Sequence, residues 1–327
     1  MEGKILRTGC WAIVCALCIR LLDIWSPGFA LSPELGDFMF FLQTGRVIRH
    51  NTVSFSPPPE TVPAEDPEPT LPEETQPDRP VFSPQDAEML AINSSFSHGA
   101  DIAALLTKPL SWDLTGDAPT VLILHSHATE SFTPNGEYRE SSPYRTLDTN
   151  YNMVSVGAYV AQRLREGGLT VLQDTTLHDS PSYNASYNNS RKSVQAYLKE
   201  YPSIRLVLDL HRDAYEDAQG NQTALTVFSQ GETAAALMFV VGTNVSGLEH
   251  PNWQENLALA LKLQTQIETL CPGICRSVNL RTQRFNQDLS AGSLLVEVGA
   301  SGNSLEEALR AAEVLAQGIL SLAHGSL

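Results

Sequence analysis

The 327-residue chain lacks an excess of positive charge. Its 21 lysine and arginine residues face 37 aspartate and glutamate residues, which gives a formal net charge of −16. Proteins that bind nucleic acid normally carry a basic face, so this composition argues against that class of function. Much of the acidity lies in residues 57–80, and it therefore says little about the surface of a folded domain.

Cysteine is scarce as well. Three of the five cysteines lie in the apolar N-terminal segment and two in the sequence CPGIC, and they do not form two CxxC pairs. A structural zinc ribbon, which needs two such pairs, is therefore not expected. Cys271 and Cys275 can form a disulfide bond in an oxidising compartment or be buried as small apolar thiols, and the sequence leaves both open.

A long hydrophobic run is also missing. A basic flank of Lys4 and Arg7 precedes an apolar run over residues 10–19. Arg20 and Asp23 keep this run below the roughly 20 residues of a comfortable membrane span. The pattern is typical of a signal peptide or signal anchor whose basic end stays in the cytoplasm. Because no A-x-A cleavage site or lipobox follows, we expect an uncleaved anchor with the rest of the chain outside the cytoplasm.

These patterns divide the chain into three regions. Residues 1–35 form the expected anchor region and residues 36–90 a linker, in which residues 57–80 hold nine prolines and seven acidic residues. Such a segment cannot bury enough apolar area to fold, and its like charges keep it extended. We therefore expect an extracytoplasmic stalk that carries one folded domain over residues 91–327.

The folded region alternates between strand and helix patterns. Short apolar runs predict strands at 121–124, 169–174, 204–211, 223–229, 235–243 and 293–299, and helical spacing predicts helices at 152–168, 189–202, 252–273 and 304–323. This alternation predicts an α/β fold, a single domain with a largely parallel central sheet flanked by helices. Near-continuous apolar strands fit burial of that sheet on both faces.

Ionisable side chains follow or interrupt three of these strands. They are His125, His127 and Glu130 after the first, Asp209, His211, Arg212 and Asp213 at the end of another, and Glu297 inside the last. Binding sites in open α/β sheets lie at the carboxyl ends of strands, so these groups are expected to converge. Two imidazoles and one carboxylate, with an open position for water, are the ligands of a catalytic zinc site. Each residue alone also has a structural interpretation, but their coincidence favours a metal site.

Four motifs carry a resemblance to a known family. They are HSHATESF, TTLHDSPSYNASYNNSRKSV, VLDLHRDA and RFNQDLSAGSLLVEVGASGNSLEEAL, in this order along the chain. Over roughly residues 91–325 the chain resembles the stage II sporulation protein P family, which are membrane-anchored cell-wall hydrolases of endospore-forming bacteria. It is similar, more remotely, to zinc-dependent N-acetylmuramoyl-L-alanine amidases.

The resemblance implies a zinc amidase-like fold and a catalytic domain over residues 91–327. It implies cleavage of the amide between N-acetylmuramic acid and L-alanine in peptidoglycan stem peptides, with endopeptidase activity on cross-links. The process would be septal wall remodelling during engulfment of the forespore. The implied partners are the stage II sporulation proteins D and M, and the implied location is the cell membrane at the sporulation septum.

Carried onto this chain, the resemblance implies zinc ligands at His127, Glu130 and His211 and a catalytic Glu297. The apolar neighbours of Glu297 are expected to raise its pKa, which suits a group that accepts a proton from water and passes it to the leaving amine. His125 is an alternative to His127, because a residue two positions away in a strand would face the same side.

Asp148 is an alternative to Glu130. It precedes Asn152 by four residues, the spacing between a ligand glutamate and an asparagine in the amidase pattern. Arg212 and Arg284 are candidates for binding stem-peptide carboxylates, because arginine pairs with carboxylates through two parallel hydrogen bonds. Asp213 is a candidate for orienting a metal ligand.

Two other functions compete with the amidase. A wall-binding scaffold that kept the fold and lost catalysis is one, and an extracellular zinc peptidase of different specificity is the other. The presence of His127, His211 and Glu297 favours an enzyme over the scaffold.

Overall fold

The structure is a computed structural model that describes residues 80–110, 113–134, 144–219, 221–229 and 231–324. The expected anchor region and most of the expected linker lie outside these residues. Among the described residues, no helix is long and apolar enough to cross a membrane. Phe82, Ala87 and Leu90 pack against the hydrophobic core, upstream of residue 91, where the folded domain was expected to begin.

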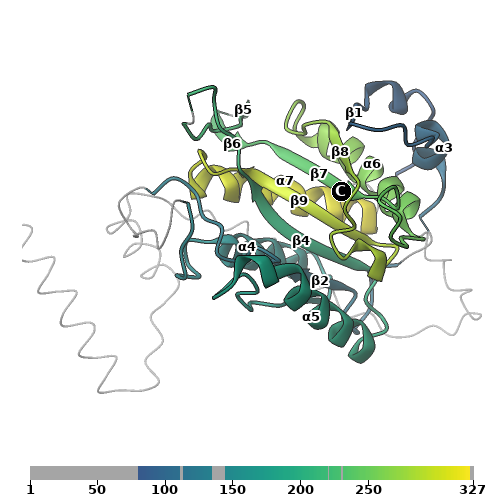
Figure 1. The fold of residues 1–327 in the computed structure, drawn as a ribbon. Helices are drawn as coiled ribbons and strands as arrows, with labels where there is room; N and C mark the ends of the chain where they lie inside the picture. The colour runs from purple at the N-terminus through teal and green to yellow at the C-terminus, as the bar shows by residue number, and fades with distance from the viewer. Residues whose placement is uncertain (1–79, 111–112, 135–143, 220, 230, 325–327) are drawn as a thin grey trace, which may run out of the picture. The chain divides into compact units, whose positions relative to one another are not determined.

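The described residues form a seven-stranded sheet, a two-stranded hairpin and flanking helices (Figure 1). The strands are β1 (Ile92–Ser94), β2 (Val121–Leu124), β3 (Val171–Gln173), β4 (Leu206–Asp213), β5 (Thr226–Ser229), β6 (Glu232–Ala235), β7 (Leu237–Gly242), β8 (Val278–Arg281) and β9 (Ser293–Ala300). The helices are α3 (Ile102–Thr107), α4 (Met153–Glu166), α5 (Ser186–Glu200), α6 (Trp253–Leu270) and α7 (Leu305–His324), with short 3₁₀ turns η1 (Asp86–Met89), η2 (Tyr183–Ala185) and η3 (Gln287–Leu289).

The large sheet has the order β1-β8-β7-β9-β4-β2-β3, and β5 pairs with β6 in the hairpin. Every neighbouring pair of the large sheet is parallel except β7 and β9. The predicted α/β fold with a largely parallel sheet is therefore confirmed. Because β2, β4 and β9 run in the same direction, their carboxyl ends lie at one edge of the sheet.

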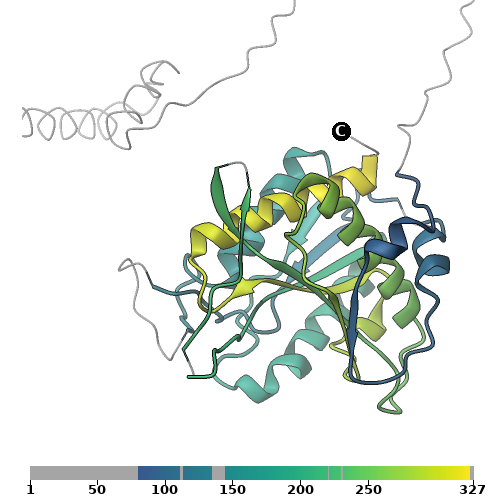
Figure 2. The same ribbon diagram turned by 90° about the horizontal axis from the view of Figure 1, so that it is seen from above.

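The alternation of side chains along the strands decides which residues lie on each face of the sheet. In β4, Leu206, Leu208 and Leu210 belong to the main core with α4, α6 and α7, whereas Val207 packs with α5. Figure 2 shows α7 and α5 on opposite sides of the sheet. His211 shares the parity of Val207, so it lies on the α5 face. Its register partner in β9 is Glu297, which places both side chains beside each other on that face.

The strand expected over residues 235–243 corresponds to β7, and its first residue, Ala235, ends β6, which was not predicted. The two strands are separate because the chain changes partner at Ala236, whose N–H donates to Leu225 next to β5 and whose carbonyl accepts the N–H of Gly299 in β9. The short strands β1 and β8 were not predicted. Their sequences, INS and VNLR, mix polar and apolar residues and lack a long apolar run. Cys271 and Cys275 are both free thiols in this structure.

Candidate active site

The loop after β2 supplies the first two predicted ligands. β2 is fully buried, and its chain continues into a turn in which the N–H of Glu130 donates to the carbonyl of His127 over 3.1 Å. Both side chains are almost completely buried, each with 6% exposure. Burial lowers the pKa of His127, and its Nδ1 atom has no hydrogen-bond partner. The loop therefore holds a neutral imidazole with an unused ring nitrogen.

His211, at the end of β4, stands between two carboxylates. Its Nδ1 atom lies 3.5 Å from Glu130 Oε2, and its Nε2 atom lies 2.9 Å from Asp209 Oδ1. The Nε2 contact has the distance of an ion pair, but its direction departs from that of a hydrogen bond. Burial alone would lower the pKa of His211, yet the charges of Asp209 and Glu130 outweigh burial and raise this pKa well above 6.5.

Glu130 is held in its ionised form by positive neighbours. Its Oε1 atom lies 3.4 Å from Arg145 Nη2, and its Oε2 atom accepts the backbone N–H of Arg212 over 3.3 Å. Burial alone would raise the pKa of Glu130, but the hydrogen bond with His211 and the charge of Arg212 lower it to about 2. Glu130 is therefore an anionic oxygen donor at any physiological pH.

Glu297 has the opposite environment. Its residue is only half-buried, but its Oε2 atom is sealed from solvent and has no hydrogen-bond partner. Burial raises the pKa of Glu297 to about 8, despite the opposing charge of His211. The two carboxylates of one site thus differ by about six units in pKa, as expected for one that stays charged and one that exchanges protons.

Two tyrosines cover the histidines. The ring centroid of Tyr183 lies 4.3 Å from that of His127, and the ring of Tyr187 stacks at 6.4 Å on His211. Tyr187 also contacts Phe285 at 5.8 Å. No role was predicted for these aromatic residues from the sequence. Tyr183 lies in η2 and Tyr187 in the first turn of α5, and their four-residue spacing, which can place two side chains on one side of a helical segment, was the signal available.

The structure does not bring His125 to this cluster. β2 ends at Leu124, so the expectation that His125 and His127 share a side does not hold. The Nδ1 atom of His125 lies 3.1 Å from the carbonyl of Leu210, and its Nε2 atom lies 3.4 Å from Gln173. The residue is fully buried against Gly157 of α4, and burial lowers its pKa to about 4.

Asp148 is also outside the cluster. It is exposed, and its Oδ1 atom accepts from the backbone and side chain of Asn150 in a local turn. Asn152 instead caps α4, since its Oδ1 atom accepts the N–H of Val154. The geometry therefore favours Glu130 over Asp148 as the carboxylate beside His211.

The remaining candidates occupy different positions around the site. The guanidinium of Arg212 is buried and donates to the carbonyls of Ser131 and Tyr144, so it fixes the loop that holds Glu130. Asp213 pairs with Arg276 at 2.7 Å, so its carboxylate is engaged by an arginine. Arg284 lines a small hollow together with Tyr187, next to the cluster.

Whether the cluster suits a metal ion can be judged from its donor atoms. Among the described residues, no three histidine, cysteine or acidic side chains have donor atoms already arranged around one point. However, two atoms that each lie about 2.1 Å from a tetrahedral zinc ion are about 3.4 Å apart, close to the 3.5 Å between Glu130 Oε2 and His211 Nδ1. His127 belongs to the same cluster, and its buried Nδ1 atom has no hydrogen-bond partner. The centroid of its ring lies 5.2 Å from that of His211. Two imidazoles and one carboxylate in one buried cluster are a donor set of the kind that suits a zinc ion.

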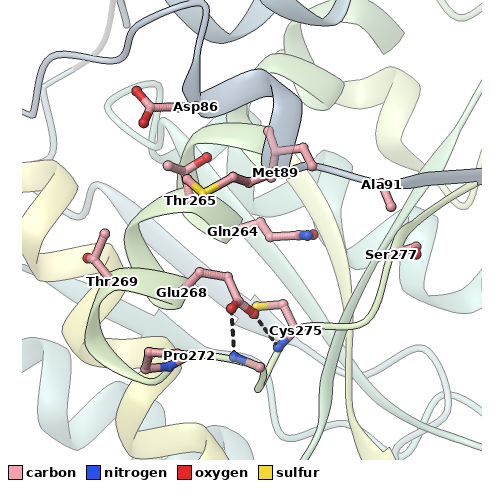
Figure 3. A pocket seen from close by; sticks show the side chains of 12 residues that line it. Asp86, Met89, Ala91, Gln264, Thr265, Glu268, Thr269, Pro272, Cys275 and Ser277 are labelled. Carbon is pink, nitrogen blue, oxygen red and sulfur yellow. Dashed lines mark hydrogen bonds between the residues drawn. The ribbon is translucent and has the colours of Figure 1, made fainter.

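A separate hollow of about 350 Å³ lies where α6 ends and β1 and β8 begin (Figure 3). None of the cluster residues lines it. The carboxylate of Glu268 in this hollow already accepts the N–H groups of Gly273 and Cys275, over 2.7 and 2.8 Å. Burial raises the pKa of the Cys275 thiol, which makes it a poor nucleophile. This hollow therefore lacks the chemistry that the cluster has.

Comparisons with solved structures find amidases at low similarity. N-acetylmuramoyl-L-alanine amidase AmiC2 of Nostoc punctiforme is 16% identical, with a TM-score of 0.39 over 63% of this chain and 98% of that chain. The CwlD amidase of Clostridioides difficile, solved in complex with the GerS lipoprotein, is 14% identical, with a TM-score of 0.38 over 63% of this chain and 95% of that chain.

Sequence comparisons are more specific. The chain is 30% identical over 213 residues to stage II sporulation protein P of Bacillus subtilis (strain 168), which covers 62% of this chain and 50% of that protein. The chain thus matches about half the length of this curated relative. Residues 50–320 match the sequence pattern of one family, and this range includes every residue of the cluster. The chain belongs to the stage II sporulation protein P family.

Proposed function

We propose that this protein is a zinc-dependent peptidoglycan hydrolase that cuts the amide between N-acetylmuramic acid and L-alanine. The observation that carries the proposal is the meeting of His127, Glu130, His211 and Glu297 at one edge of the sheet, with buried atoms that lack a hydrogen-bond partner at His127 Nδ1 and Glu297 Oε2. Unsatisfied buried polar atoms are rare in folded proteins and are tolerated where a ligand or a reaction uses them. Membership of a sporulation protein family and the amidase-like motifs support the same assignment.

Three side chains would hold the metal, namely His127, Glu130 and His211. When bound, zinc would polarise the scissile carbonyl as a Lewis acid. The hydrogen bond with His211 and the charge of Arg212 keep Glu130 ionised, so the site is ready to bind a cation without first losing a proton at Glu130.

Glu297 would move the proton. In its ionised form Glu297 can accept a proton from the attacking water as the water oxygen bonds to the carbonyl carbon, and a pKa near 8 keeps both its ionised and its protonated form accessible close to neutral pH. The same carboxyl then passes this proton to the amide nitrogen as the carbon–nitrogen bond breaks. The products are a free carboxyl on the lactyl group of N-acetylmuramic acid and a free amine on L-alanine.

Substrate would be bound on the α5 side of the sheet. Tyr187, Phe285 and Arg284 line the small hollow beside the histidines, and the Arg284 side chain is 27% exposed. Arg284 Nη1 donates to the carbonyl of Glu249 and lies 3.4 Å from Asp288, so its remaining N–H groups are the ones suited to a stem-peptide carboxylate. The Arg212 guanidinium is committed to backbone carbonyls and is assigned instead to holding Glu130.

We assign the wider biology by resemblance to the family. The protein would be anchored in the cell membrane through residues 1–35, with its catalytic domain outside the cytoplasm at the sporulation septum. It would act in wall remodelling during engulfment, together with the stage II sporulation proteins D and M, and would also cleave peptide cross-links as an endopeptidase.

The test is digestion of purified sacculi by the zinc-loaded full chain. An amidase releases stem peptides with a free L-alanine amine and leaves glycan strands without new reducing ends. An extracellular peptidase of other specificity would release different amino termini, and a silent scaffold would bind sacculi and release nothing. Either of those outcomes would replace the amidase assignment.

A further inference from the structure

Asp209 is held rigidly beneath His211. Its Oδ1 atom accepts the backbone N–H of Ser126 over 2.7 Å, and its Oδ2 atom accepts the Ser126 hydroxyl over 2.6 Å. Asp209 and Ser126 are buried, with 6% and 0% exposure. The same Oδ1 atom lies 2.9 Å from His211 Nε2, an ion-pair contact whose direction departs from that of a hydrogen bond. The carboxylate therefore has a fixed position relative to one nitrogen of the ring.

The hydrogen bonds behind Asp209 run in one direction. Because the Ser126 hydroxyl donates its proton to Asp209, it can only accept from Ser190 Oγ, which lies 2.7 Å away. Ser190 in turn accepts from Asn286 Nδ2 over 3.1 Å. The orientation of the Asn286 amide is fixed, since Nδ2 also donates to the carbonyl of Tyr187 and Oδ1 faces Arg191.

In the chain from Asn286 through Ser190 and Ser126 to Asp209, each hydroxyl accepts from one neighbour and donates to the next, and the Ser190 hydroxyl has in addition a longer, 3.4 Å contact with the carbonyl of Tyr187. Hydrogen bonds aligned in this way polarise one another and strengthen the whole chain. Asn286 is in the left-handed region, with φ of 58°, as is the preceding Phe285, with φ of 51°. Such backbone strain persists where the surroundings hold it, and here the amide contacts of Asn286 do so.

The two nitrogens of His211 therefore face different partners. Nε2 faces Asp209, and Nδ1 faces Glu130. We propose that Asp209, fixed by the chain Asn286–Ser190–Ser126, is a positioning residue that keeps the proton of His211 on Nε2 and presents Nδ1 to the metal. This inference rests on the proposed function, because it requires His211 to be a ligand.

The first experiment measures metal affinity by competition with a chromogenic chelator, using zinc and the full chain. Asp209→Asn keeps the size of the side chain but removes its charge, and we expect an affinity about 10- to 100-fold lower, the usual effect of losing such a partner. Ser126→Ala removes one hydrogen bond behind the carboxylate, and we expect a loss of about 2- to 10-fold. Asp117→Asn, at an exposed position, is the matched control and should bind zinc as the native protein does.

The second experiment identifies the bound nitrogen. In full chain labelled with ¹⁵N in histidine and loaded with ¹¹³Cd²⁺, we expect cadmium–nitrogen coupling at Nδ1 of His211 and a retained proton on Nε2. In Asp209→Asn the Nε2 proton should exchange faster or move to Nδ1. This readout does not depend on activity, and circular dichroism verifies that each variant is folded.

The outcomes separate the two proposals. Coupling at Nε2 of His211, or unchanged affinity in a folded Asp209→Asn variant, would overturn the positioning role while leaving the zinc hydrolase intact. Failure of the native protein to bind either metal would overturn both.

Discussion

At the scale of single residues, the site separates two carboxylates by their surroundings. Glu130 lies among Arg145, Arg212 and His211, and its pKa falls to about 2. Glu297 is held in an apolar strand, and its pKa rises to about 8. The difference has a simple origin, since Glu130 has three cationic neighbours while one oxygen of Glu297 has no hydrogen-bond partner. Environment rather than residue type thus separates the two carboxylates, which suits the roles of metal ligand and proton carrier proposed for them.

Substitution of Glu297 should therefore separate chemistry from metal binding. Glu297→Gln preserves shape and removes the proton acceptor, so we expect zinc content to remain and turnover to fall about 10²- to 10⁴-fold. His127→Ala and His211→Ala should lose zinc and activity together. Zinc content and release of stem peptides from sacculi are measured for all three variants. Loss of zinc from Glu297→Gln would identify Glu297 as a ligand instead.

The choice between Glu130 and Asp148 can be tested by a matched pair of amide variants. Because Glu130 lies 3.5 Å from His211 Nδ1 whereas Asp148 faces only a local turn, Glu130→Gln should weaken zinc binding and Asp148→Asn should not. Equilibrium dialysis with zinc gives the two affinities. A selective loss in Asp148→Asn would restore the sequence-based alternative and would mean that the loop rearranges on binding metal.

At the scale of elements, the sequence predicted the helices and strands that have a clear hydrophobic pattern of their own. The long amphipathic helices α4, α6 and α7 and the apolar strands β2, β4 and β9 agree with the expected spans, because each has a clear period and a marked end. β1 and β8 have no such pattern, and they are strands only because neighbouring backbone groups pair with them. Local sequence does not contain that information.

One contact between elements should control how stability depends on pH. Lys262 of α6 is 2% exposed and donates to the carbonyls of Leu105 and Leu106 in α3. Burial lowers its pKa from 10.5 to about 8. Between pH 8 and 10.5 the unfolded chain therefore binds more protons at this lysine than the folded chain does, so its contribution makes stability rise with pH over this window.

The Lys262→Met variant tests that contribution. We expect the free energy of unfolding in urea to rise less between pH 8 and pH 10 in this variant than in the native protein. Lys192→Met is the control, because Lys192 is an exposed lysine of α5, whereas the charge of the other nearby lysine, Lys108, itself contributes to the lowered pKa of Lys262. If Lys262→Met and the native protein had the same slope, the burial of this ammonium group would not influence stability.

At the scale of the whole molecule, the sequence predicted the central residues of the site better than it predicted the residues that surround them. Parallel strands place their carboxyl ends together, which is why His127, His211 and Glu297 could be expected to meet. The aromatic cover of Tyr187 and the support from Asp209 depend on how α5 docks on the sheet. Those contacts join residues far apart in the chain, and no periodic pattern reports them.

The boundary of the folded domain gives the last prediction. From the sequence pattern the domain is expected to begin at residue 91, but Phe82, Ala87 and Leu90 pack on the core. The ring of Phe82 lies 5.1 Å from the ammonium group of Lys262. Removing residues 80–90 should therefore expose apolar surface and cost about 1–3 kcal/mol, roughly the value of burying one large side chain. For a domain of this size, each 1 kcal/mol lowers the Tm by about 2–4 °C.

We expect both fragments, 80–327 and 91–327, to bind about one zinc ion per chain, since every assigned ligand lies within the shorter one. The shorter fragment should melt at a lower temperature, and Phe82→Ala in the longer fragment should reproduce part of that loss. Differential scanning calorimetry and metal analysis give both quantities. Equal melting temperatures would show that residues 80–90 add no stability, and the domain would then begin at residue 91 as its pattern suggests. If fragment 91–327 folded but bound no zinc, residues 80–90 would be needed for metal binding although they hold none of the assigned ligands.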